Sequence, residues 1–194
     1  ETRTLEGLWL APYGSHGMEI ISLQRISGPQ KSSSSPSQSM NHCMLTSRSQ
    51  TRTCTIPYPR LEGMKVIGDA NVPTSKLSFV VALREPCDIN SRLAADRRQV
   101  VSFPPDGFVI TDLSHRQRNM VAWYRGAGQI NRQKGKWDPE WVGLDFIIYD
   151  QEGSVAYSLV WDEDDEELRH MIDFTRVNLV EASNEEARPF HIVG

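Results

Sequence analysis

The chain has 194 residues, a formal net charge of −4 and 39% hydrophobic residues. This length allows one hydrophobic core of ordinary size, so we expect a single domain over residues 1–183 and a carboxy-terminal tail over 184–194. No positive excess draws the chain to phosphates, and no run approaches the roughly 18 apolar residues of a membrane span. Neither nucleic acid nor a membrane is therefore expected as a partner.

Three cysteines, Cys43, Cys54 and Cys87, are odd in number and lack Cys-x-x-Cys spacing. Neither a disulfide framework nor a zinc site is therefore predicted. No Asn-x-Ser/Thr sequon is present, which agrees with a reducing compartment. We expect a cytoplasmic or nuclear protein without a metal or a cofactor.

The first predicted elements are two strands over residues 7–13 and 18–26, where apolar and β-branched residues dominate. Gly14 and Gly17 separate them, which is the outline of a hairpin. Residues 27–55 are rich in Ser, Gln and Thr and poor in apolar side chains. Burial of this segment could not offset the entropy lost on ordering it, so a long flexible insertion is predicted there.

Further short runs rich in Val, Ile or Phe predict more strands after the insertion. One short helix is predicted within 87–99, with Asn90 or Ser91 as its cap. The dipeptide Glu152-Gly153 predicts a tight hairpin turn. The predicted strands lie at 62–68, 77–83, 99–103, 119–130, 141–150, 154–161 and 169–177. This pattern indicates a mainly β fold, an antiparallel barrel or sandwich with at most one or two short helices.

The stretch APYGSHGMEI places His16 three residues before Glu19. Positions three apart on a strand point to opposite faces, and the glycines on both sides of Ser15-His16 argue against a helix. His16 is therefore interpreted as a hydrogen-bonded turn residue, with a role in a site left open.

The stretch IGDANVP puts Gly68, Asp69, Asn71 and Pro73 into one loop between two predicted strands. Asp and Asn side chains bond nearby backbone amides, and Pro73 favours an extended residue before it, so the loop is expected to be rigid. Two interpretations follow: a well-made turn, or a preorganised rim that presents the Asp69 carboxylate to a ligand.

Glycines and tryptophans mark the second half of the chain. Gly126 and Gly128 do not complete a dinucleotide fingerprint, because Asn131 stands where the last glycine is needed, and they are interpreted as sites of a bulge or sharp bend beside exposed Arg125. Among the five tryptophans, Trp9 and Trp123 are predicted in the core, and Trp137 and Trp141 at a rim.

The acidic run 162–167 lacks the glycine and the final glutamate of a calcium loop, so it is predicted to be a solvated connection. No Ser-His-Asp order, Cys-His pair or Gly-x-Ser-x-Gly elbow is present. A non-enzymatic protein is therefore predicted.

Two stretches, 7–23 and 61–83, resemble the carboxy-terminal substrate-binding domain of the F-box only protein 31 family, especially its fungal-type relatives. That family shows a Tyr-Gly-x-His-Gly-x-Glu motif and, after an insertion, a Gly-Asp-Pro-Asn-x-Pro loop. This sequence has YGSHGME at 13–19 and GDANVP at 68–73, with Ala70 in place of the usual proline. The resemblance is looser over 122–150 and 169–177.

The resemblance implies a lipocalin-like antiparallel barrel that serves as the substrate receptor of a Skp1-cullin-F-box ubiquitin ligase and holds short peptides or carboxy-terminal ends of target proteins. By the matched positions, Asp69 is the first substrate-binding candidate, followed by Asn71 and His16. Arg125, Trp137 and Trp141 complete the candidate substrate-binding residues. The Asp69 carboxylate would favour a donor such as a terminal amide over a free carboxylate. No F-box is expected within these 194 residues, so the link to Skp1 and cullin would run through sequence outside them.

Two alternatives stay open. A lipocalin-like carrier of a small apolar ligand requires a deep apolar cavity with no polar group at its floor. An enzyme would need His16 within hydrogen-bond reach of Glu19 or Asp69 and of a pocket.

Overall fold

The structure is a computed structural model. Backbone structure is described for residues 5–12, 17–28, 43–47, 50–54, 56–69, 72–96, 98–102, 107–131, 140–151, 154–162 and 168–177. The predicted tail 184–194, the candidate residues His16, Asn71 and Trp137, and the turn residues Glu152 and Gly153 lie outside these ranges.

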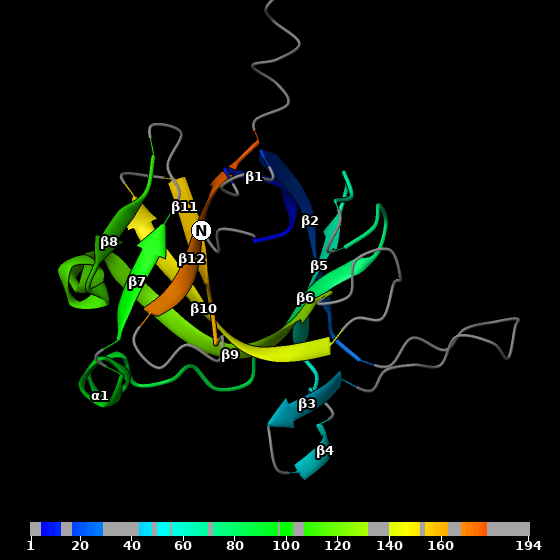
Figure 1. The fold of residues 1–194 in the computed structure, drawn as a ribbon, viewed down its shortest axis with the longest axis horizontal. Helices are drawn as coiled ribbons and strands as arrows, with labels where there is room; N and C mark the ends of the chain where they lie inside the picture. Colours follow the sequence, from blue (N-terminus) through cyan, green and yellow to red (C-terminus); the bar gives the residue numbers. More distant parts are fainter. Residues whose placement is uncertain are drawn as a thin grey trace, which may run out of the picture.

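Eight antiparallel strands close into a barrel, which confirms the predicted mainly β, lipocalin-like fold (Figure 1). The ring closes because β10 pairs with both β9 and β11, while β12 pairs with both β11 and β1. Around the ring the strands are β9 (Met120–Ile130), β10 (Glu140–Gln151), β11 (Ser154–Trp161), β12 (Leu168–Arg176), β1 (Gly7–Pro12), β2 (Met18–Ile26), β5 (Arg60–Lys65) and β6 (Leu77–Ala82).

Alternate residues of these strands fill the barrel with aromatic side chains. On β11, Tyr157, Leu159 and Trp161 belong to the inner core, as the period of two of a strand requires. The rings of Trp9 and Tyr157 meet edge to face, with centroids 4.9 Å apart, and Tyr157 stacks on Phe174 at 4.6 Å. Trp9 is fully buried, as predicted.

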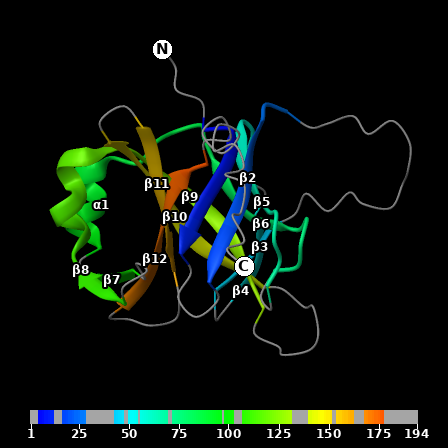
Figure 2. The same ribbon diagram turned by 90° about the horizontal axis from the view of Figure 1, so that it is seen from above.

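A second layer covers the outer face of β9 to β12. It comprises α1 (Ile89–Ala95), β7 (Gln99–Ser102), β8 (Val109–Thr111) and a 3₁₀ helix (Leu113–Asn119). Figure 2 shows α1, β7 and β8 together on one side of the barrel, where β7 pairs in parallel with β12. Trp123, predicted in the core, is fully buried in the cluster between the two layers.

Helix α1 has an earlier cap than the sequence predicted. Asp88 is its cap, and the Asp88 carboxylate accepts a 2.7 Å hydrogen bond from the Ser91 backbone N–H. The predicted caps Asn90 and Ser91 lie inside the helix. Aspartate caps a helix as well as asparagine or serine does, so residue type alone did not decide which of these neighbouring residues forms the cap.

Part of the predicted flexible insertion forms strands. Residues Cys43–Ser47 and Gln50–Cys54 form the hairpin β3–β4, and Leu45 pairs in parallel with Trp141 of β10. The prediction of a flexible loop is wrong for these two segments. Threonine recurs in this stretch and fits a pleated strand well, a preference that the low apolar content concealed.

The two glycines of β9 meet close neighbours rather than a bulge. A Cβ at Gly126 would lie 2.5 Å from the Val80 carbonyl oxygen, and one at Gly128 would lie 2.1 Å from the Trp161 ring. The register shift of the β9–β10 pairing lies elsewhere, between Ile148 and Tyr149. These glycines therefore give room for inward side chains and the neighbouring strand.

Candidate functional site

The strand ends next to the YGSHGME and GDANVP stretches lie at one end of the barrel. Pro12 pairs with Met18 at the end of the first hairpin, and β5 and β6 run into the loop that contains Asp69. Ile21 pairs with Lys65, and β6 begins beside the end of β9, so these connections lie around the same opening. We call this region the Asp69 end of the barrel.

Backbone hydrogen bonds and close packing fix the Asp69 loop. The Asp69 carboxylate accepts a 2.7 Å hydrogen bond from the Val72 N–H, and the Asp69 N–H donates to the Val72 carbonyl at 2.9 Å. Gly68 donates its N–H to Thr74 Oγ1, and a Cβ at Gly68 would lie 2.2 Å from the Thr74 nitrogen. These contacts hold Gly68, Asp69 and Val72 in place, and the close approach of Thr74 requires glycine at position 68.

Three charged side chains join the YGSHGME stretch to the GDANVP stretch. Lys65 Nζ lies 2.6 Å from Glu19 Oε1 and 2.5 Å from Asp69 Oδ2. The side chains are 3% exposed for Lys65, 9% for Glu19 and 17% for Asp69, so Asp69 is the most exposed of the three. One ammonium between two carboxylates leaves a net charge of −1, which favours hydrogen-bond donors and cations.

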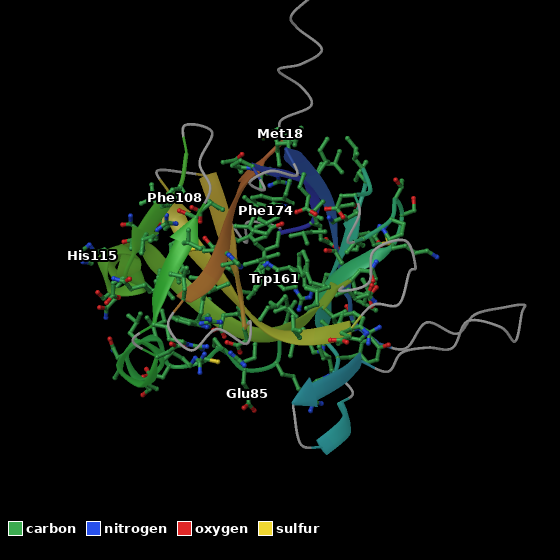
Figure 3. The ribbon with its side chains drawn as sticks, viewed as in Figure 1. Met18, Glu85, Phe108, His115, Trp161 and Phe174 are labelled. Carbon is green, nitrogen blue, oxygen red and sulfur yellow. The ribbon has the colours of Figure 1, made fainter. Side chains whose placement is uncertain are left out.

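Two polar atoms inside the barrel have no hydrogen-bond partner in the part of the chain that the structure describes. They are the Tyr157 hydroxyl and Trp161 Nε1, and both belong to the inner core. Burial, together with the negative charge of Glu19, raises the pKa of Tyr157 well above its ordinary value, so the phenol is a neutral donor. Figure 3 shows Trp161 inside the ring of strands.

Exposed apolar side chains flank the Asp69 end. Met18 is 52% exposed, Val66 is 40% exposed and Ile67 is 56% exposed. They come from the start of β2 and the segment after β5, and Figure 3 shows Met18 at the edge of the barrel. Large apolar groups left in water beside a fixed polar group are typical of a surface that binds another protein.

The other described candidates lie apart from Asp69. Arg125 points outward from β9 and contacts Asp145 and Asp162. Trp141 is half-buried on the outer face of β10, where it packs against a small cluster with Ile56 and Val80. The structure therefore joins Asp69 to Glu19 and Lys65, and it places Arg125 in a different cluster.

That cluster is an ion network between α1 and the barrel. We call it the outer ion network; it comprises Arg92, Asp96, Arg98, Arg125, Asp145, Asp162 and Arg169. Asp145 is fully buried and meets Arg125 at 2.6 Å, Arg169 at 2.8 Å and Arg92 at 2.9 Å. Asp162, predicted in a solvated acidic run, contacts Arg98, Arg125 and Arg169, so that prediction is wrong for this residue.

The arginines keep the carboxylates of Asp96 and Asp145 ionised. A hydrogen bond from Arg98 lowers the pKa of Asp96 to about 2. Burial opposes ionisation of Asp145, but the charges of Arg125 and Arg169 outweigh it and hold the pKa of Asp145 below its usual value. The signal that could have revealed this network is the lone Asp145 in the apolar run WVGLDFIIYD, because a carboxylate buried in a strand requires cationic partners.

The described residues contain no group of three or more His, Cys, Asp and Glu side chains arranged to hold a metal ion. None of the described helices is long and apolar enough to cross a membrane.

The sequence model of one protein family, described as the Cyclin D1 binding domain, matches residues 1–181. The chain belongs to this family. A comparison with curated proteins gives no match. The family is named for the binding of a protein, and this match and the fold together support a β-barrel that binds proteins.

Proposed function

We propose that this chain is the substrate-recognition barrel of an F-box protein of the F-box only protein 31 type. It binds a short peptide, in particular the carboxy-terminal end of a target protein, at the Asp69 end. The target is then presented to a Skp1-cullin ligase through an F-box outside these residues. This activity belongs to the cytoplasm or the nucleus.

The observation that carries the proposal is the fixed carboxylate of Asp69 beside exposed apolar side chains. Lys65 and the Val72 N–H hold the carboxylate in place, so binding a ligand requires little further ordering. Met18 and Ile67 offer apolar contact next to it. A peptide end supplies matching features, because it carries one polar group and an apolar side chain close together.

The charge of the site indicates which peptide ends it prefers. Glu19, Lys65 and Asp69 together carry a net charge of −1. A free carboxylate would be repelled, whereas a terminal amide donates hydrogen bonds to Asp69. We therefore expect amidated or otherwise uncharged ends to bind more tightly than free acids.

The barrel interior gives less support to the alternative function, a lipocalin-like carrier of a small apolar ligand. Its interior contains the aromatic side chains Trp9, Phe79 and Phe146, which are fully buried. Glu19 and Lys65 place charge at one end of this interior, where an apolar ligand would need none.

The test is binding of a peptide library with free-acid and amidated ends, measured by fluorescence polarisation at fixed salt. Cyclin D1 is the first whole protein to include, because the family is named for it. We expect selective binding that Asp69→Asn weakens at least about tenfold, the size of a lost charge-assisted hydrogen bond. Asp112→Asn is the control, because Asp112 is an exposed helix cap. Equal binding by wild type and Asp69→Asn, or no binding at all, would overturn the proposal.

A further inference from the structure

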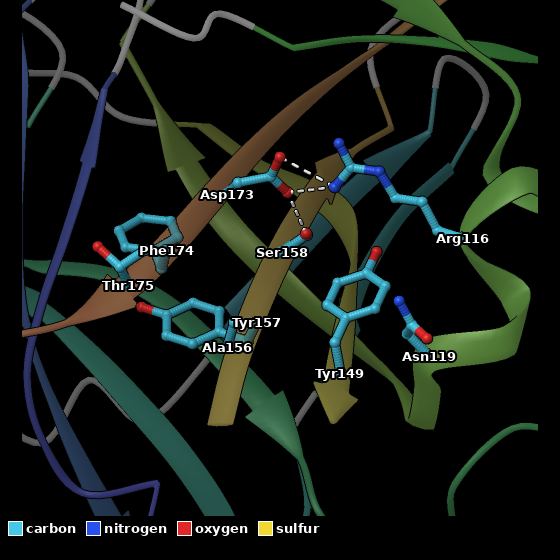
Figure 4. A pocket seen from close by; sticks show the side chains of 9 residues that line it. All are labelled: Arg116, Asn119, Tyr149, Ala156, Tyr157, Ser158, Asp173, Phe174 and Thr175. Carbon is cyan, nitrogen blue, oxygen red and sulfur yellow. Dashed lines mark hydrogen bonds and ion pairs between the residues drawn. The ribbon is translucent and has the colours of Figure 1, made fainter. Parts of the chain in front are cut away.

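A polar pocket of about 260 Å³ lies on the outer face of the barrel, near the end opposite Asp69. Residues of β10, β11 and β12 line it, together with Arg116 and Asn119 of the 3₁₀ helix (Figure 4). Tyr149 and Ala156, which pair close to the β10–β11 turn, place it at that end. Neither the family motifs nor the proposed function uses these residues.

Arg116 and Asp173 form an ion pair in the pocket. Arg116 donates from Nη1 to both oxygens of Asp173, at 2.8 and 2.9 Å, and the Ser158 hydroxyl also donates to this carboxylate. A guanidinium has five N–H donors, and both hydrogen bonds of Arg116 to Asp173 come from Nη1, while Tyr149 is its other close neighbour in the pocket. The two side chains are 33% and 41% exposed, so a ligand can reach both.

A buried donor points into the same pocket. Tyr149 is 5% exposed, and its hydroxyl lies beside Ser158 and Arg116 without a hydrogen bond of good geometry in the described part of the chain. Burial raises the pKa of Tyr149, so the hydroxyl keeps its proton at neutral pH. Figure 4 shows this hydroxyl pointing toward Ser158 and Arg116. A buried polar group without a partner is unfavourable, and a ligand that accepts its hydrogen bond would relieve that penalty.

The charges in the pocket select among ligand classes. Arg116 and Asp173 together carry no net charge. A simple anion is attracted by the arginine but repelled by the aspartate, whereas a simple cation is attracted by the aspartate but repelled by the arginine. A small molecule with a carboxylate and an ammonium close together gains from both. Its carboxylate can accept from Arg116 Nε and Nη2 and from the Tyr149 hydroxyl, while its ammonium donates to Asp173.

We propose that this pocket binds a small zwitterion of the α-amino acid class. The volume suits a free amino acid, and Ala156 adds apolar surface to the lining. The site is separate from the Asp69 end, so the pocket can bind its ligand whether or not the barrel reads peptide ends.

The test is calorimetric titration of the whole chain with each of the twenty free α-amino acids at neutral pH. We expect at least one to bind with a millimolar or lower dissociation constant. The N-acetyl derivative of that amino acid retains only the anion, its amide retains only the cation, and the N-acetyl amide retains neither charge. Each of these should bind at least about tenfold more weakly, because each loses one charged contact or both. No binding by any amino acid at about 10 mM, or equal binding by a blocked derivative, would overturn the proposal.

Variants tie the binding to the pocket. Tyr149→Phe removes only the hydroxyl and should weaken binding about three- to tenfold. Arg116→Lys keeps the charge but loses the planar fork and should weaken binding more. Arg84→Gln removes an exposed arginine outside the pocket, and Asp69→Asn alters only the other site; both should bind the amino acid as wild type does. Unchanged affinity in both Tyr149→Phe and Arg116→Lys would contradict the assignment even if an amino acid bound.

Discussion

The outer ion network and the Asp69 end are both built from charged side chains, but they differ in how carboxylates and cations are arranged. In the network, each carboxylate contacts at least two arginines, and Asp145 contacts three. At the Asp69 end, one lysine lies between two carboxylates, next to apolar side chains exposed to solvent. The first arrangement surrounds each carboxylate with guanidinium groups and joins α1 to the barrel, whereas the second shares one ammonium between two carboxylates beside exposed apolar side chains. Charge alone therefore does not distinguish a structural cluster from a binding site.

The largest expected loss of stability comes from a substitution at Asp145, the central carboxylate of the outer ion network. Asp145→Asn leaves Arg169, which is fully buried, and two further arginines without their shared carboxylate. Removal of one partner from a buried ion cluster costs about 3–5 kcal/mol, so the free energy of unfolding in urea should fall by that amount. Asp69→Asn should lower it by less than about 1 kcal/mol, because the amide oxygen can still accept from Val72. Similar losses for the two variants would show that both clusters are structural.

The second largest expected effect is a loss of folding stability at low pH, because protonation of Asp96 and Asp145 weakens the outer ion network. The folded pKa of Asp96 is about 2, and that of Asp145 is lowered, while an unfolded aspartate titrates near about 3.9. Stability from these groups is therefore fully present above the unfolded pKa and is lost as pH falls from about 5 toward 2. For Asp96 this loss is on the order of 2 kcal/mol.

Urea unfolding at a series of pH values between about 7 and 2 measures this dependence. Asp96→Asn removes one of the titrating groups, so its stability should depend less steeply on pH in the acidic range. A variant with the same slope as wild type would show that Asp96 does not contribute to the acid sensitivity.

The inside of the barrel is sensitive to volume as well as to charge. Gly128→Ala places a methyl group against the Trp161 ring, which would lie only 2.1 Å from the added carbon, and Leu144 crowds the same point at 2.9 Å. Overpacking of this kind costs about 1–3 kcal/mol, measured by thermal or urea unfolding. Gly28→Ala is the matched control, because no atom lies within 4 Å of a Cβ there. Equal stability of the two variants would indicate that Trp161 moves aside freely.

The local pattern of apolar and β-branched residues was enough to predict most strands. It could not predict contacts between residues that lie far apart in the sequence. Residues 18–26 and 154–161 were predicted as strands and form β2 and β11 with the same bounds, because hydrophobic and β-branched composition acts within each strand. The outer ion network was missed because Arg92 and Asp145 lie 53 positions apart. Glu19 and Asp69 were both found in motifs, but Lys65, which joins them, lies in a strand that nothing in its local sequence marks as part of a site.

The smallest expected effect on stability is the most informative about the barrel interior. Tyr157→Phe removes a hydroxyl that is fully buried and has no hydrogen-bond partner among the described residues, while the ring keeps its stacking on Phe174. Because a buried unpaired hydroxyl is unfavourable, the free energy of unfolding should stay the same or rise by up to about 1 kcal/mol. In the outer ion network, by contrast, removal of a polar group should lower stability. A fall of more than about 1 kcal/mol for Tyr157→Phe would mean that the fold itself uses this hydroxyl, and the interior would then resemble the network. A stable variant that binds peptide more weakly would instead place the hydroxyl at the ligand, because only a bound ligand would then supply its missing partner.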